Sequence, residues 1–171
     1  NTHNKEVIYS CLGYVLLGKI IERATNKPLN EFFREHVAVP LDCKTLGFGP
    51  IKNKDNVAAT EHGNPHEQGM ARRYGDISII KWRRHLLQGE VHDGNAFYGF
   101  GGVAGNAGLF SNAVDLVKFT RTYMRGKLIK KTTAQLMIED HTGGEEKRGL
   151  GWRIDLFTGV LSPESVGTTG F

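Results

Sequence analysis

Apolar residues recur at helical spacing near the start of the chain. The first stripe consists of Leu12, Val15, Leu16, Ile20 and Ile21. Because Asn26 and Pro28 follow it as stop signals, this spacing predicts a helix over 12–26. A second apolar stripe predicts a helix over 29–37, which ends before Pro40.

The middle of the chain alternates between irregular and periodic segments. Residues 41–67 show little hydrophobic period and much Gly, Asn, Pro and Lys, which predicts a long irregular connector. Amphipathic spacing predicts helices over 77–87, 113–125 and 132–139, and Ser111-Asn112 provides good caps for the second of them. The inner face predicted for that helix comprises Leu116, Val117, Phe119, Thr120 and Tyr123.

After Gly143-Gly144 the pattern changes to that of strands. Alternation with smaller or polar residues predicts a strand that contains Leu150, Trp152, Ile154 and Leu156. Two more strands are predicted over 160–161 and 166–171. Helices followed by a run of antiparallel strands predict an α+β domain.

Composition and charge limit the class of protein. The 171 residues are 39% hydrophobic and 23% charged, as in a soluble globular domain, and no apolar run approaches the roughly 20 residues of a membrane span. The net charge is +4, with basic residues gathered at Arg72-Arg73, 81–84 and 127–131. Since no nucleic-acid-binding signature accompanies them, we expect no nucleic-acid partner. Two cysteines do not form a disulfide framework, and we expect no cofactor.

The compartment stays open. The sequence begins at Asn1 without a charged segment or an apolar segment of a signal peptide. A signal peptide lost upstream would place the protein in a bacterial cell envelope or outside the cell, and its absence would leave the protein in the cytoplasm.

Five short motifs occur in a fixed order along the chain. They are Tyr9-Ser10-Cys11, Val39-Pro40-Leu41 with 45–48, the glycine-rich 101–111 before Asp115 to Phe119, Gly149 to Trp152, and Gly167 to Phe171. In this order they resemble the serine β-lactamase-like proteins, which comprise β-lactamases, D-alanyl-D-alanine carboxypeptidases and related esterases. The resemblance implies a β-lactamase/transpeptidase-like fold, here a helical subdomain plus part of an antiparallel sheet flanked by helices.

The resemblance also implies a catalytic role for Tyr9. Acyl transfer in this family needs a tyrosine that relays protons, and nearby cations must favour its phenolate at neutral pH. A packing role for Tyr9 ahead of the helix is the alternative. The resemblance places Cys11, Thr168, Thr169 and Gly170 in substrate binding. Cys11 stands where the family usually has Asn, and Thr168 where it has Lys or His, so both weaken the expected site.

The nucleophile of the family, a serine in a Ser-x-x-Lys motif, precedes the tyrosine. Eight residues precede Tyr9 and none is a serine, so residues 1–171 are expected to form one partial domain without that motif. Ser78-x-x-Lys81 has the spacing but follows Tyr9. Cys11 at a helix N-terminus is a second candidate nucleophile, against which a buried inert thiol is the better interpretation.

One histidine pair has the spacing of metal ligands. His62 and His66 would share a helix face, but the Gly63-Asn64-Pro65 between them argues against a helix, and we expect no metal.

The expected function is therefore hydrolysis by a serine hydrolase through an acyl-enzyme. Its substrate would be a β-lactam, a peptidoglycan-type D-Ala-D-Ala peptide or a small ester. The alternative is an inactive family member that binds cell-wall material or peptides. Because the partial sheet would expose a strand edge from Gly149 to Phe171, we also expect self-association.

Overall fold

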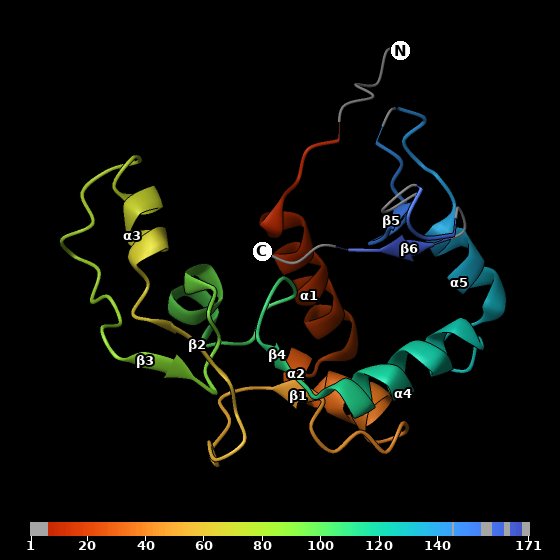
Figure 1. Ribbon diagram of the computed structural model, residues 1–171, viewed down its shortest axis with the longest axis horizontal. Helices are drawn as coiled ribbons and strands as arrows, with labels where there is room; N and C mark the ends of the chain where they lie inside the picture. Colours follow the sequence, from red (N-terminus) through yellow and green to blue (C-terminus); the bar gives the residue numbers. More distant parts are fainter. Residues whose placement is uncertain (1–6, 145, 155–158, 163–164, 169–171) are drawn as a thin grey trace. The chain divides into compact units, whose positions relative to one another are not determined.

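The computed structural model describes residues 7–144, 146–154, 159–162 and 165–168, and the chain divides into two compact units. The first unit is Ser10–Val117. The second unit combines Asn1–Tyr9 with Lys118–Phe171. Both units contain helices and short antiparallel strands (Figure 1), so the predicted α+β class is confirmed.

Two helices open the first unit. Helix α1 (Cys11–Thr25) ends where Asn26 adopts the left-handed conformation, with φ of 51°. Helix α2 (Leu29–Phe33) packs against α1 and continues as a π-helix, η1 (Arg34–Ala38). The helices predicted over 12–26 and 29–37 are thus confirmed, apart from the π-helical hydrogen bonding of the last turn.

Two small sheets lie within the segments between helices. Strand β1 (Gly47–Phe48) pairs with β4 (Leu109–Phe110), and β2 (Ala59–His62) pairs with β3 (Leu86–Gln88), both antiparallel. The prediction of an irregular connector over 41–67 is therefore wrong, and so is the order of helices first and strands afterwards. Strands of two to four residues are too short for their alternation to stand out in the sequence.

The helix predicted over 77–87 is also wrong. These residues form turns and extended chain that lead into β3. The Asp76 carboxylate accepts hydrogen bonds from the Ser78 backbone N–H (2.8 Å) and hydroxyl (2.9 Å), which fixes a turn and lowers the pKa of Asp76. The buried Arg83 side chain requires extended backbone around it.

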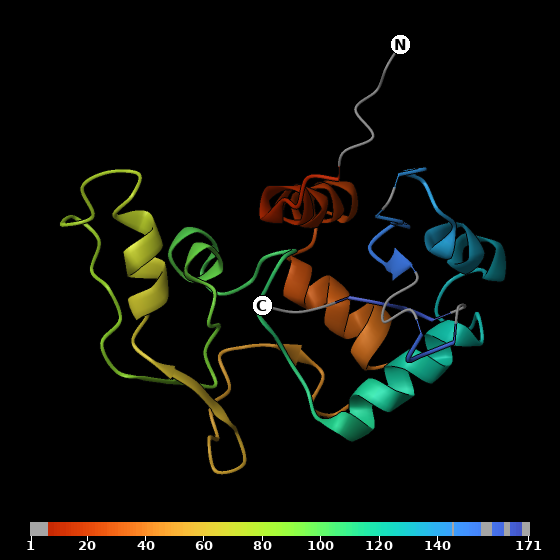
Figure 2. The same cartoon turned by 45° about the horizontal axis from the view of Figure 1, so that its top comes forward.

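Two further helical segments, α3 and η2, lie next to each other in the first unit. Helix α3 (Pro65–Ala71) and the π-helix η2 (Asn95–Gly99) lie side by side in both views (Figures 1 and 2). The Glu67 carboxylate accepts a hydrogen bond from the Gly94 backbone N–H at 2.6 Å, which connects the two segments.

The apolar core of the first unit joins α1 to η2 and the glycine-rich segment that follows. Its buried members are Val15, Val91, Ala96 and Ala104, against which Phe97, Phe100 and Ala107 pack. Leu87 of β3 is fully buried as well. The core is small, so polar contacts have to hold much of this unit together.

The most buried of these contacts surround Arg83, whose residue is 5% exposed. Its guanidinium donates to the Asn64 side-chain oxygen (2.9 Å) and to the backbone carbonyls of Val91 (2.5 Å) and His92 (2.7 Å). Asn64 is fully buried and also donates to the His92 carbonyl at 3.1 Å. The Phe97 ring lies 4.0 Å from the guanidinium carbon. One cation therefore joins three chain segments.

A second buried charge fixes the start of helix α4 (Ala113–Met124). Asn112 caps the helix by accepting a hydrogen bond from the Asp115 N–H at 2.8 Å. The Asp115 carboxylate is 4% exposed and accepts from both the backbone N–H and the hydroxyl of Thr45, each at 2.7 Å. The predicted helix is confirmed, but Leu116 and Val117, placed on its inner face, are about half exposed.

The second unit contains the end of α4, helix α5 (Lys131–Ile138) and the paired strands β5 (Arg153–Ile154) and β6 (Val166–Gly167). The Trp152 indole N–H donates to the Tyr123 hydroxyl at 3.0 Å, and that hydroxyl contacts the Met137 sulfur at 3.8 Å. The helix predicted over 132–139 is confirmed within one residue at each end.

The predicted strands of the second unit are shorter than expected where the structure describes them. Leu156 and residues 169–171 lie outside the described residues, so self-association through the edge from Gly149 to Phe171 stays a prediction. Of the helices in the described ranges, none has the length and apolar character needed to cross a membrane.

The Arg83 network predicts a large and local effect on stability. Arg83→Met would leave the Asn64 oxygen and the buried Val91 carbonyl without their donor, and would leave the His92 carbonyl with the Asn64 amide alone, so we expect the free energy of unfolding to fall by about 3–5 kcal/mol. Asn64→Ala should cost about 1–3 kcal/mol. Urea unfolding followed by circular dichroism measures both.

Arg84 provides the matched control, because it is the next residue and is exposed. Arg84→Met should change the free energy of unfolding by no more than about 0.5 kcal/mol. Equal losses for the two arginine variants would contradict a structural role for the buried guanidinium.

Candidate active site

The N-terminus of α1 carries three of the motif residues. Ser10 is the N-cap, with extended backbone (φ −146°, ψ 112°), and its hydroxyl accepts a hydrogen bond from the Gly13 N–H at 3.4 Å. This cap leaves Tyr9 just outside the helix and makes Cys11 its first residue. Tyr9 is 76% exposed.

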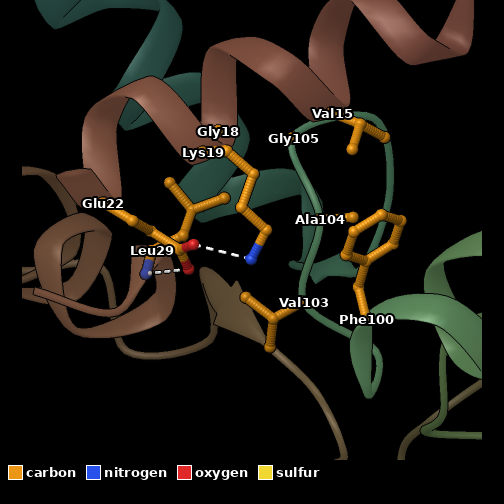
Figure 3. A pocket seen from close by; sticks show the side chains of 9 residues that line it. All are labelled: Val15, Gly18, Lys19, Glu22, Leu29, Phe100, Val103, Ala104 and Gly105. Atoms are coloured by element: carbon orange, nitrogen blue, oxygen red, sulfur yellow. Dashed lines mark hydrogen bonds and ion pairs between the residues drawn. The ribbon is translucent and has the colours of Figure 1, made fainter.

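Helix α1 is held in place by a close backbone contact. A Cβ atom built on Gly105 would overlap the carbonyl oxygen of Tyr14, and one built on Gly18 would lie 3.1 Å from the Gly105 nitrogen. Figure 3 shows Val15, Gly18 and Lys19 facing the segment that carries Phe100 and Gly105. Only glycine permits this approach, so the glycine-rich segment sets the position of α1.

A chain of polar contacts fixes the other end of α1. The Lys19 ammonium lies 2.7 Å from one carboxylate oxygen of Glu22, and the other oxygen accepts from the Leu29 N–H at 3.1 Å (Figure 3). The hydrogen bond from Lys19 is the main reason why the pKa of Glu22 lies below its usual range. The depression around these residues is shallow and forms no enclosed cavity for a ligand.

One face of α1 is left uncovered by the described residues of the first unit. Its exposed side chains are Leu12 (70%), Leu16 (63%), Leu17 (55%) and Ile20 (61%). A row of large apolar side chains at helical spacing is the pattern of a helix that packs on two sides.

The other predicted substrate-binding residues belong to the second unit. Thr168 follows β6 directly and is exposed. Thr169 and Gly170 lie outside the described residues. The structure thus places Tyr9 and Cys11 at the N-terminus of α1 and Thr168 directly after β6.

The structure separates Ser78 from Lys81 and leaves the predicted roles of Cys11 untested. Ser78 and Lys81 lie in a turn and in extended chain rather than on one helix, and the Ser78 hydroxyl donates to Asp76. Cys11 is half-buried, not the buried thiol that the better interpretation expected, and it forms no disulfide.

The histidine pair is split between two elements. His62 ends β2 and His66 lies in α3, as the residues between them predicted. Within the described part of the chain, no group of three potential metal ligands comes together.

Comparison with known proteins decides the family. The whole chain, residues 1–171, matches the family described as Beta-lactamase. The chain belongs to the Beta-lactamase family. The resemblance read from the five motifs is therefore confirmed, and hydrolases are the activity class of its relatives.

Two bacterial relatives carry the name D-alanyl-D-alanine carboxypeptidase. The protein from Escherichia coli (strain K12) is 34% identical over 96% of this chain, and that from Salmonella enteritidis PT4 (strain P125109) is 35% identical over the same share. Each match covers 40% of the relative, so the chain spans about two fifths of the length of these proteins.

Solved structures confirm the β-lactamase/transpeptidase-like fold. An octameric penicillin-binding protein homologue from Pyrococcus abyssi superposes on 90% of this Beta-lactamase family chain with a TM-score of 0.59 at 22% identity. The D-amino acid amidase from Ochrobactrum anthropi SV3 also covers 90%, with a TM-score of 0.57 at 18% identity. The matches cover 31% and 41% of those two chains, respectively.

Sequence reasoning missed the residues that support the site rather than those in its motif. Ser10 directly before an apolar helical stripe is a recognisable cap signal, so its role was available from the sequence. The contact between Gly105 and Tyr14 could not be predicted from the sequence, because the two residues lie far apart in the chain and no local pattern indicates that they meet.

The Gly105 contact predicts that this position tolerates no side chain. Gly105→Ala should push α1 away from the glycine-rich segment and lower the free energy of unfolding by about 1–3 kcal/mol. Gly13→Ala is the matched control, since no atom lies within 4 Å of a Cβ at this helical position. It should be neutral or stabilising by about 0.5–1 kcal/mol in urea unfolding. A neutral Gly105→Ala would show that α1 is positioned by other contacts.

Proposed function

We propose that the protein to which this chain belongs is a serine hydrolase that acts through an acyl-enzyme, with Tyr9 as the proton relay. The observation that carries the proposal is the exposed Tyr9 at the capped N-terminus of α1, in register with the other family motifs. The N-cap on Ser10 places Tyr9 directly before the first turn of α1.

The proposed reaction has two steps. A serine hydroxyl, supplied by a part of the protein outside these 171 residues, attacks the carbonyl carbon of the substrate while the Tyr9 phenolate takes its proton; Tyr9 then gives this proton to the amine as the bond between the carbonyl carbon and nitrogen breaks. Water next attacks the ester carbonyl carbon while Tyr9 takes a proton from it, and Tyr9 gives that proton to the serine oxygen as the ester bond breaks. Tyr9 takes and gives one proton in each step, so it ends the cycle unchanged.

The substrate class that we favour is a peptide ending in D-Ala-D-Ala. Relatives at 34% and 35% identity are named D-alanyl-D-alanine carboxypeptidases, which supports this class over β-lactams and small esters. The exposed position of Tyr9 suits a substrate that arrives from solvent.

The departures at Cys11 and Thr168 favour a second candidate. A thiol is a weak hydrogen-bond donor and acceptor, so Cys11 would hold a substrate amide less well than the family asparagine. Thr168 supplies no positive charge. A family member with these two changes could bind cell-wall peptides without turning them over.

A substitution of Tyr9 in the whole protein separates the hydrolase from the binding module. Tyr9→Phe should lower kcat toward a D-Ala-D-Ala peptide by about 10²-fold or more, which is the usual effect of losing a general acid and base. Tyr74→Phe is the matched control, because Tyr74 is 91% exposed and lies away from the motif. An unchanged kcat in Tyr9→Phe would make Tyr9 a packing residue, and peptide binding without turnover in the unaltered protein would favour the binding module.

Thr168→Lys refines the same measurement. A lysine at this position adds a cation that favours a phenolate, so activity should rise at lower pH than in the unaltered protein. A pH profile that does not move would place Thr168 away from the proton relay.

Covalent labelling of the 171 residues alone tests where the nucleophile lies. Because the expected nucleophile lies outside them, incubation with a fluorescent penicillin or a fluorophosphonate should give no covalent adduct in intact-mass spectrometry. The complete carboxypeptidase relative from Escherichia coli serves as the comparison for labelling. A stoichiometric adduct on Ser78 or Cys11 would contradict the proposed location of the nucleophile.

A further inference from the structure

The end of α4 and the start of α5 carry a concentration of positive charge. We call residues 118–131 the basic segment, which contains no acidic residue and six basic ones, namely Lys118, Arg121, Arg125, Lys127, Lys130 and Lys131. All of them except the half-buried Lys118 are exposed. A density of six cations in 14 residues stands out in a chain whose net charge is only +4.

The exposed cations of the basic segment have no partner among the described residues. The side chains of Arg121, Arg125, Lys127, Lys130 and Lys131 make no hydrogen bond or ion pair there. In the second unit, an ion pair joins Arg148 to Glu146. The charge of these five exposed side chains is therefore not used to bind the described residues around them, whereas Lys118 does interact with another part of the chain.

The segment is nevertheless ordered, because a tight turn connects its two helices. Gly126 has φ of 63°, its N–H donates to the Tyr123 carbonyl at 2.9 Å, and the Lys127 N–H donates to the Thr122 carbonyl at 3.0 Å. This pair of bonds is the Schellman motif that ends helices. A Cβ on Gly126 would lie 3.2 Å from the Lys131 Cβ, so the start of α5 lies directly against the end of α4.

Helix electrostatics explain only part of the charge. Arg121 and Arg125 near the C-terminus of α4 interact favourably with its dipole, whereas Lys130 and Lys131 stand at the positive end of α5. The first turn of α5 has no acidic residue, and no side chain caps it. Two lysines at this place oppose the local electrostatics, as expected of residues that serve an external anion.

One strongly exposed apolar side chain lies among the cations of the basic segment. Met124 is 76% exposed and belongs to the last turn of α4, beside Arg125 and three residues after Arg121. A soluble polyanion would leave this thioether in water. The headgroup layer of a bilayer can instead receive the apolar side chain while its phosphates face the cations.

We propose that the basic segment attaches the protein to the surface of an anionic phospholipid bilayer, with Met124 entering the headgroup layer. The contact is peripheral and does not depend on the proposed hydrolase activity. It would hold the protein beside a membrane surface by charge and by one shallow apolar side chain.

The test is flotation of the whole protein with vesicles of phosphatidylcholine containing 30% phosphatidylglycerol, against vesicles of phosphatidylcholine alone. We expect binding to the anionic vesicles only, and a loss of binding as salt is raised. Reversing Lys127, Lys130 and Lys131 to glutamate should weaken binding by about tenfold or more. Met124→Ala should weaken it less.

The matched control reverses three exposed lysines elsewhere in the chain, Lys44, Lys52 and Lys54, to glutamate. Both triple variants change the net charge equally, so only the position of the charge differs. Equal losses in the two variants, or no binding by the unaltered protein, would overturn the proposal. Binding to heparin or DNA without binding to anionic vesicles would assign the segment to a soluble polyanion instead.

Discussion

A buried guanidinium carries much of the architecture of the first unit. The Arg83 side chain donates to Asn64, directly before α3, and to the carbonyls of Val91 and His92, ahead of η2. The backbone N–H of Arg83 donates to the Tyr98 hydroxyl at 2.8 Å. An apolar side chain of the same size could fill the space but could not donate to the buried Val91 carbonyl or to the Asn64 oxygen. The strand pair β2–β3 and the segment after it therefore depend on one residue that sits in an otherwise solvent-facing run of basic residues.

The successes of the sequence analysis follow from locality. Helices α1, α4 and α5 have their periodic stripes and their end signals within a few consecutive residues, and the structure places each within one or two residues of its expected bounds. The failures are non-local. Leu86 and Leu87 read as a helix face next to basic residues, whereas Leu87 is buried in a strand whose partner lies about 25 residues earlier.

In the candidate site, too, local features could be predicted from the sequence and non-local ones could not. Tyr9 and Cys11 could be proposed because their motif is contiguous, and their roles stay predictions. The family that the order of the five motifs indicated is confirmed. Arg83 escaped notice because a basic residue between Trp82 and Arg84 looks like part of a solvated face until Asn64 is brought to it. The surroundings of Thr168 depend on strands two residues long, which no periodicity could locate.

The contact between Gly105 and Tyr14 has an evolutionary consequence. It joins main chain to main chain, so the spacing between α1 and the glycine-rich segment is set by Gly18 and Gly105, which carry no side chain. Substitutions on the exposed face of α1 can therefore accumulate without moving the residue at its N-terminus, provided that both glycines persist.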